Sequence, residues 1–261
     1  RFPAGSRPME VVQHEGAVCV FLYDAEGETR FRNAQGEAQP LLVRKSDGAF
    51  LYPTTDLAAV RYRTGDLGAD WLVYVTDSRQ ALHFQMFFQA AREAGWVGDR
   101  QLEHVTFGTV LGPGGTPLKT REGGNVKLSD LLDEAVERAT RLIQANEEDP
   151  DRQRGFSPEE VQEIAAAVGI GAVKYADLSQ NRSSDYVFSF DRMLALEGNT
   201  APYLLYAYAR IRSIQRRAGQ LPDQPRMLLE DPHERRLALH LARLGETLDQ
   251  VVSGWRLNLL C

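Results

Sequence analysis

The sequence predicts an α/β fold with a parallel sheet up to about Gly124 and an all-α part after it. Strand-like apolar segments alternate with helical segments in the first part, as in parallel α/β sheets. Beyond a glycine-rich stretch, apolar residues recur at helical period. Of 261 residues, 43% are hydrophobic and 25% charged, and the net charge is −6. These values exclude a collagen-like chain, a disordered tail and a disulfide scaffold.

The α/β part is a series of short apolar segments separated by turn signals. Thr54, Thr55 and Asp56 indicate a helix start, and Gly95 indicates a helix end. In order, we expect strands at residues 17–23, 40–44 and 50–52, with a hairpin or surface loop at 24–39 between the first two, then a helix from 54 to about 66, a strand at 71–75, a helix at 80–95 and a strand at 105–110.

The all-α part shows amphipathic periodicity and clear helix starts. Ser157 is an expected cap, with Pro158 as the first helical residue and Glu160 completing a capping box. Residues 199–202 open another helix, 222–232 form a linker, and 233–252 form a last helix. One apolar face recurs at Leu131, Leu132, Ala135, Val136, Ala139, Leu142 and Ile143.

Several classes of protein and site are disfavoured. The apolar run at residues 164–173 is about half the length of a membrane helix, so we expect no membrane span. Cys19 and Cys261 form no metal or disulfide pattern, and the five histidines show no metal or Ser/His/Asp spacing. No signal peptide is recognisable. The chain does not begin with Met and ends on an apolar segment, so we expect a piece of a longer protein.

Asp56 is a candidate binding residue at the carboxyl edge of the expected sheet. It lies one residue into the helix that follows strand 50–52, where ligands of parallel sheets bind. A carboxylate there can pair with a guanidinium or an ammonium group. The alternative is that Asp56 only caps its helix. Gln80 begins the next helix at the same edge, although Asp77 and Ser78 are equally good caps.

The stretch at residues 112–124 holds five glycines and two prolines around Lys119 and Arg121. Such a loop suits phosphate binding, but it lacks the Walker A pattern and is equally compatible with a surface loop. On the preceding strand, His104 is more typical of a structural role, and Gly108 leaves room for a flat base. Further on, Tyr206, Tyr208 and Arg210 suit nucleotide stacking and phosphate contact. The alternative is a helix that packs about half of its tyrosines inward.

Five collinear segments together resemble class I arginyl-tRNA synthetases. They are DGAFLYPTTDLAAVRYR (47–63), VTDSRQALHFQMFF (75–88), the segment from LEHVTFG to SDLLDEA (102–135), GIGAVKYADLSQNRSSDYVFSFDRML (169–194) and EGNTAPYLLYAYARIRSI (197–214). The resemblance implies the second half of a Rossmann-type sheet followed by a helical bundle. It also implies an arginine–tRNA ligase that uses ATP and Mg²⁺ as a substrate complex, without a tightly bound metal.

The resemblance also implies roles for particular residues. Tyr52, Asp56 and Gln80 match positions that contact the substrate arginine, with Asp56 facing the guanidinium. The adenine-side strand is matched by His104, Phe107, Gly108 and Val110. Segment 118–122 stands at the KMSKS loop but departs from the consensus. Lys119 falls at its central Ser and Thr120 at its second Lys, so we expect Lys119 or Arg121 to neutralise phosphate charge during catalysis.

The same resemblance divides the chain. Residues 1–127 would be the carboxy-terminal half of the catalytic domain, with 1–48 partly an insertion. Residues 128–198 would be connecting helices that contact the tRNA stem, and 199–261 the truncated start of the anticodon-binding bundle. Tyr206, Tyr208 and Arg210 fall in the first helix of that bundle and are expected to contact tRNA. A cytoplasmic monomer without membrane association is expected.

One family signature, HxGH, is not found in this sequence. We therefore expect that the chain alone does not form arginyl-adenylate. The alternative is a synthetase paralogue that lost catalysis and acts as a tRNA- or protein-binding module. A third option, another nucleotidyl transferase of the same fold, does not explain the helical segments after Gly169.

Overall fold

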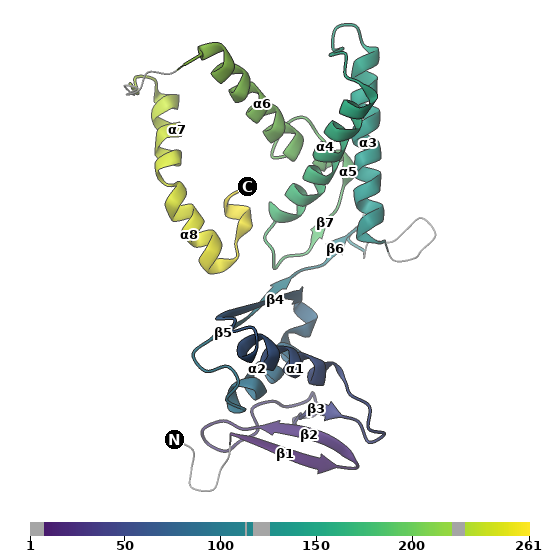
Figure 1. The fold of residues 1–261 in the computed structure, drawn as a ribbon, viewed down its shortest axis with the longest axis vertical. Helices are drawn as coiled ribbons and strands as arrows, with labels where there is room; N and C mark the ends of the chain where they lie inside the picture. Colours follow the sequence, from purple (N-terminus) through teal and green to yellow (C-terminus); the bar gives the residue numbers. More distant parts are fainter. Residues whose placement is uncertain (1–7, 113, 117–125, 221–227) are drawn as a thin grey trace. The chain divides into compact units, whose positions relative to one another are not determined.

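The computed structural model describes residues 8–112, 114–116, 126–220 and 228–261. The chain divides into two compact units, Arg1–Phe107 and Gly108–Cys261, and each has its own hydrophobic core (Figure 1). The first unit contains both strands and helices, and the second is mainly helical. The predicted α/β class with a following all-α part is confirmed.

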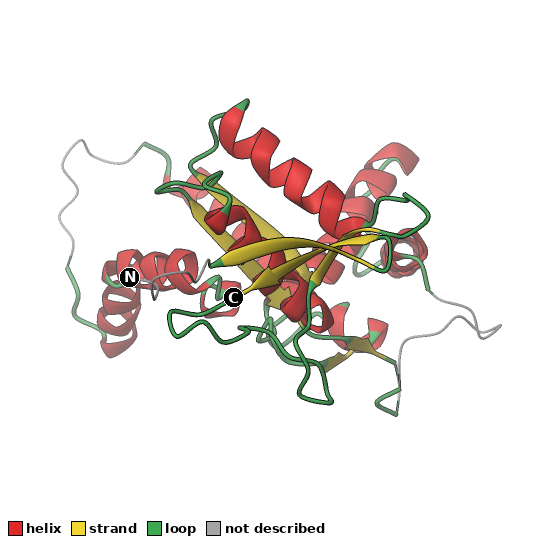
Figure 2. Cartoon of the chain, turned by 90° about the horizontal axis from the view of Figure 1, so that it is seen from below, coloured by secondary structure: helices red, strands yellow, loops and turns green. Residues whose placement is uncertain are grey.

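The first unit begins with an antiparallel sheet of β1 (Met9–His14), β2 (Ala17–Leu22) and β3 (Leu41–Arg44), which lie in that order. Figure 1 labels these strands, and Figure 2 draws the strands of the chain in yellow. Strands β2 and β3 were expected, whereas β1 was not. The predicted strand at 50–52 is wrong. Phe50 makes only an isolated bridge to Arg44, and Tyr52 already begins a helix.

That helix is α1 (Tyr52–Gly65), which starts two residues before the predicted position. Pro53 lies in its first turn, where a fixed φ and a missing N–H cost nothing. Thr54 and Thr55 therefore do not cap the helix. Their hydroxyls donate instead to the carbonyl oxygens of Val43 and Tyr52.

A parallel pair of strands follows α1. Strand β4 (Trp71–Asp77) runs beside β5 (Gln101–Phe107), and the 3-10 turn η1 (Ser78–Gln80) and helix α2 (Ala81–Glu93) connect them. The predicted strand 105–110 is interrupted, because the backbone N–H of Gly108 donates to the Arg182 carbonyl. Beyond that point, β6 (Val110–Leu111) pairs in parallel with β7 (Tyr186–Val187) in the second unit.

One core fixes α1 and α2 between the strands of the first unit. Phe87 and Val60 are completely buried, and they share a cluster with Leu22, Leu41 and Leu72 from three strands. Burying a phenylalanine or leucine side chain contributes about 1.5–3 kcal/mol. The relative positions of α1 and α2, which carry the candidate site, are therefore set by well-packed contacts.

In the second unit, helix α3 (Leu128–Glu148) packs on α4 (Pro158–Leu178). The predicted capping box at Ser157 and Glu160 is present. Small residues, including Ala135 and Ala172, bring the two helices close together. The short helix α5 (Phe190–Met193) and α6 (Ala201–Ala218), capped by Thr200, complete this packing.

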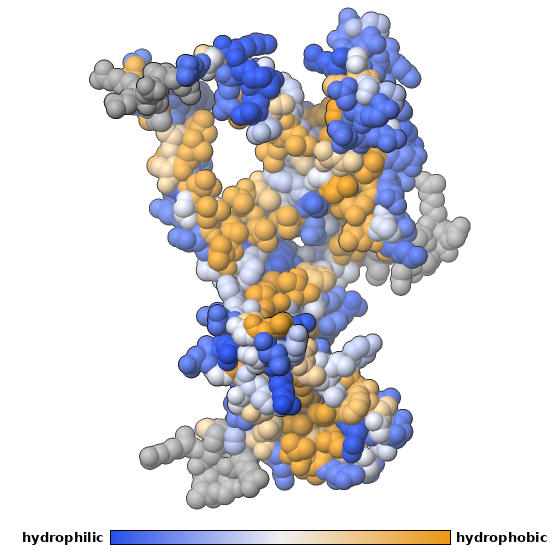
Figure 3. All heavy atoms as spheres, in the orientation of Figure 1, coloured by the Kyte–Doolittle hydropathy of each residue, from blue (hydrophilic) through white to orange (hydrophobic). Residues whose placement is uncertain are grey.

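The predicted last helix is divided in two. Helix α7 (Pro232–Ala242) ends and α8 (Leu244–Gly254) begins at Arg243, before the 3-10 turn η2 (Leu257–Leu259). Gly245 follows the break, and a glycine costs about 1 kcal/mol in a helix interior. Apolar side chains along α7 and α8 are exposed (Figure 3), among them Leu237, Leu239, Leu241, Leu244, Leu248 and Val252. Of the helices described, none has the length and apolar character needed to cross a bilayer.

Candidate functional site

The candidate site centres on a contact between α1 and α2. His83 Nε2 lies 2.6 Å from Asp56 Oδ2, and the two side chains are 28% and 32% exposed. Asp56 is the fifth residue of α1, two positions further into the helix than predicted, because α1 starts at Tyr52. Its bond to His83 also argues against a role as helix cap. The carboxylate remains accessible to solvent on one side.

Aromatic rings surround the His83 imidazole. It packs edge-on against Phe84, with the ring centroids 5.6 Å apart, and is tilted against Phe87 at 5.1 Å. Both phenylalanines are buried. The imidazole is therefore supported by the core while its Nε2 atom contacts the carboxylate.

His104 contacts the same Phe84 ring. Its ring stacks on Phe84 with a centroid distance of 4.0 Å and an interplanar angle of 15°. His104 Nε2 is 2.7 Å from the Thr76 hydroxyl oxygen. Burial and, secondarily, the nearby His83 lower the pKa of His104, because both disfavour a charged ring. The neutral form of the His104 imidazole is therefore favoured.

Tyr74 adds a polar group to this region of the first unit. Its hydroxyl oxygen is buried and has no hydrogen-bond partner among the residues that the structure describes, and the Arg63 guanidinium lies 5.3 Å from the centre of its ring. Burial raises the pKa of Tyr74, Asp56 raises it further, and Arg63 opposes this effect. The tyrosine is therefore a neutral phenol near Asp56.

Tyr52 and Gln80 lie on the same helix faces as the Asp56–His83 pair. Tyr52 precedes Asp56 by one turn of α1 and is 83% exposed. Gln80 precedes His83 by three residues, is exposed, and makes no cap hydrogen bond with its side chain. Residues three or four apart share a helix face. The sequence prediction therefore named three of four polar residues on adjoining helix faces and missed His83.

Asp77 closes β4 just before Gln80. Its carboxylate accepts hydrogen bonds from the Arg79 guanidinium and backbone N–H, each at 2.8 Å. These bonds, chiefly the one from the side chain, lower the pKa of Asp77 to about 2. Asp77 therefore caps the turn, which is the alternative that the sequence left open. The Gln80 side chain does not act as a helix cap.

The other predicted nucleotide residues lie at the end of β5 and after it. Phe107 is exposed at the last position of β5, and Val110 pairs with Tyr186 in the second unit. A Cβ on Gly108 would lie 2.5 Å from the Ser184 carbonyl oxygen, so a close approach of protein backbone accounts for glycine there. Lys119 and Arg121 lie outside the described residues.

The predicted tRNA residues are exposed on α6. Tyr206 and Tyr208 are 56% and 62% exposed, so the expectation that about half of the tyrosines pack inward is wrong for this pair. Arg210 Nη1 lies 3.4 Å from the Tyr206 hydroxyl. At 100° per residue, Tyr208 points about 200° away from Tyr206. Tyr206 and Arg210 therefore form one surface, and Tyr208 lies on another.

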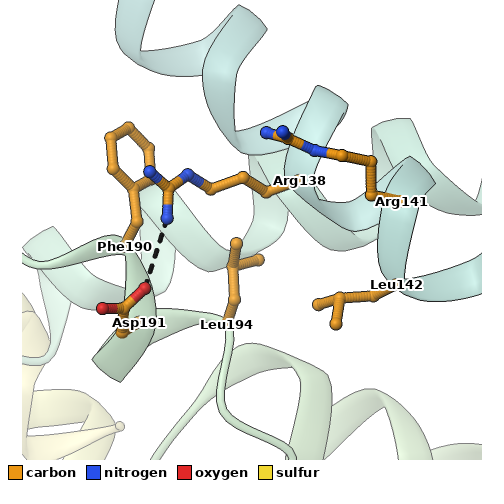
Figure 4. Close-up of a pocket in the computed structure, with 6 residues that line it drawn as sticks. All are labelled: Arg138, Arg141, Leu142, Phe190, Asp191 and Leu194. Carbon is orange, nitrogen blue, oxygen red and sulfur yellow. Dashed lines mark hydrogen bonds and ion pairs between the residues drawn. The ribbon is translucent and has the colours of Figure 1, made fainter.

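A separate pocket of about 490 Å³ lies beside α3 and α5 (Figure 4) and contains none of the predicted site residues. Arg138 donates to Glu134 and Asp191 at 2.7 and 3.2 Å, and its guanidinium lies over the Phe190 ring. These carboxylates compensate the positive charge. Among the described residues, no group of three acidic, His or Cys side chains could hold a metal ion.

Comparison with known proteins agrees with this fold. Residues 7–190 match the family described as tRNA synthetases class I (R), catalytic domain. Residues 204–261 match the DALR anticodon binding domain. The chain belongs to the arginyl family of class I tRNA synthetases.

Similar proteins cover the chain almost completely. An arginine–tRNA ligase from Cyanothece sp. is 51% identical over 96% of this chain and 42% of its own length. One from Synechococcus elongatus is 53% identical with the same coverage. The solved arginyl-tRNA synthetase of Plasmodium falciparum is 29% identical, has a TM-score of 0.71, and is matched over 95% of this chain and 40% of its own. The chain spans less than half the length of these relatives.

Proposed function

We propose that this chain is part of an arginine–tRNA ligase, which activates arginine with ATP and transfers it to tRNA. The observation that carries the proposal is the partly exposed Asp56 carboxylate, in a chain that belongs to this family. A guanidinium has five N–H donors in a planar fork, and a carboxylate is its natural complement. Tyr52 and Gln80, on adjoining helix faces, would add hydrogen bonds to the same substrate.

The remaining roles follow the family pattern. His104, Phe107, Gly108 and Val110 would contact the adenine side of ATP, and Mg²⁺ would enter with ATP as part of the substrate. Lys119 and Arg121 would neutralise the phosphates during attack by the arginine carboxylate, a step that depends on positioning and charge. Tyr206, Tyr208 and Arg210 would contact tRNA.

We also propose a domain division and setting for the chain. Residues 1–127 would belong to the catalytic domain, 128–198 would connect it and contact the tRNA stem, and 199–261 would begin the anticodon-binding bundle. The matches to the two families at 7–190 and 204–261 support a change of domain near residue 200. The enzyme would act as a cytoplasmic monomer.

Substitution of Asp56 tests the proposed function. In the complete enzyme, Asp56→Ala is expected to raise the KM for arginine at least tenfold, about 1.4 kcal/mol for a lost charge-assisted pair. The KM for ATP is expected to change little. Asp66→Ala, at the exposed other end of α1, is the matched control. An unchanged KM for arginine in Asp56→Ala would exclude the assigned role.

A further inference from the structure

We propose that His83 is a positioning residue for substrate arginine and acts by holding the Asp56 carboxylate in place. This inference rests on the proposed function, because it assumes that Asp56 binds the guanidinium. Sequence reasoning assigned His83 no role. The structure places its imidazole against the carboxylate, between α1 and α2.

The direction of the hydrogen bond follows from the chemistry of the two groups. An ionised carboxylate only accepts hydrogen bonds, so His83 Nε2 carries the hydrogen and donates it to Asp56 Oδ2. The 2.6 Å separation is short for an N–H···O bond, and hydrogen bonds to an ionised acceptor are shorter than neutral ones. His83 therefore fixes the orientation of the Asp56 carboxylate. The carboxylate itself still accepts hydrogen bonds from the substrate.

Asp56 keeps enough acceptor capacity for a second donor. A carboxylate has about four lone-pair positions, of which His83 uses one. Oδ1 and the remaining position on Oδ2 are available for the two parallel N–H groups of a guanidinium. The partial exposure of both side chains leaves a route for substrate from solvent.

The imidazole is itself held by the core. Phe84 and Phe87 contact its ring, and both belong to the cluster that fixes α2 against the strands. Other groups near the pair are Tyr74 on β4, Arg63 on α1 and His104 on β5. A carboxylate oriented in this way loses less conformational freedom when arginine binds. Because this entropic cost is smaller, preorganisation increases the affinity for arginine.

A double-mutant cycle in the complete enzyme tests this inference. His83→Phe keeps an aromatic ring against Phe84 and Phe87 but removes the donor. We expect it to raise the KM for arginine about tenfold, with the KM for ATP and kcat changed less than about threefold. His83→Gln, which returns an N–H donor, is expected to recover most of the affinity. His83→Leu serves the same test if the phenylalanine variant does not fold.

The cycle distinguishes positioning from independent contact. If His83 acts through Asp56, Asp56→Asn combined with His83→Phe raises the KM for arginine no more than about twofold beyond Asp56→Asn alone. Gln89→Leu is the matched control. Gln89 lies on the same helix, almost two turns beyond His83, and its side chain donates to Glu93 instead of Asp56. Its KM values are expected to remain unchanged.

Several results would overturn the inference. Additive effects of the two substitutions would mean that His83 acts independently of Asp56. An unchanged KM for arginine in His83→Phe, while Asp56→Asn raises it, would remove His83 from the site. Both results would leave the proposed function intact. An unchanged KM for arginine in Asp56→Asn would overturn the proposed function and this inference with it. A fall in melting temperature without a change in KM would mean that the pair only joins α1 to α2.

Discussion

The contact between α3 and α4 makes a prediction that opposes ordinary helix propensity. Replacing a glycine inside a helix by alanine normally stabilises it by about 0.5–1 kcal/mol. At Gly169, however, the new Cβ would lie 2.7 Å from the backbone nitrogen of Val136 and 2.8 Å from the carbonyl carbon and oxygen of Ala135. Carbon atoms in contact are usually about 3.5–4.0 Å apart, so the helices would have to separate.

Overpacking of this kind costs about 1–3 kcal/mol, and the upper part of the range applies because the neighbouring atoms are backbone. After the gain in propensity, we expect Gly169→Ala to lose about 1–2 kcal/mol. Gly171 is the matched control on the same helix, since its Cβ would meet only the Ala201 Cβ at 4.0 Å. Gly171→Ala is expected to gain about 0.5–1 kcal/mol.

Urea denaturation followed by circular dichroism would measure both variants against the parent protein. The two free energies of unfolding are expected to move in opposite directions. If Gly169→Ala were as stable as Gly171→Ala, the close approach of α3 and α4 would not constrain this position, and the reasoning would be refuted.

Two further predictions concern stability. Because the folded-state pKa of His104 is lowered, the folded protein binds this proton less well than the unfolded chain. The stability is therefore expected to fall as the pH drops below 6.5, the usual pKa of histidine, and to fall less in His104→Gln. An equal pH dependence of the melting temperature in the variant and the parent protein would contradict this. Ser157→Ala removes a side chain of the capping box and is expected to cost about 1 kcal/mol in the same urea assay, whereas Ser157→Asp retains an acceptor and most of the stability.

The sequence was most informative where the physical cause is local. The capping box at Ser157 and the cap at Thr200 involve residues within four positions of each other, so their chemistry is visible in the string. Sequence reasoning failed at Tyr52, although Pro53 was an available signal for an earlier helix start. Sequence reasoning also joined α7 to α8. The helical period of apolar residues continues across Arg243, but the helical backbone is interrupted there.

The candidate site divides in the same way. Tyr52, Asp56 and Gln80 were named from the sequence, and the resemblance gave them roles. The expected position at the sheet edge, where a helix starts after a strand, holds for Gln80, which follows β4, but not for Asp56, because residues 50–52 form no strand. His83 lies in the same segment, but its partner is 27 residues away, and no spacing rule connects the two. The adenine contact of Gly108 stays a proposal from the resemblance, and only the tertiary structure shows that a Cβ at this position would meet the backbone of Ser184.

The sequence by itself determined the class of fold, the order of most elements and the family to which the chain belongs. Those features depend on periodicity, capping and motif order, which are properties of neighbouring residues. Only the tertiary structure decided which side chain meets Asp56, how closely α3 approaches α4, and which strands pair. Each of these depends on atoms that packing brings together from distant positions, and the free energy of such contacts is not encoded in any single segment.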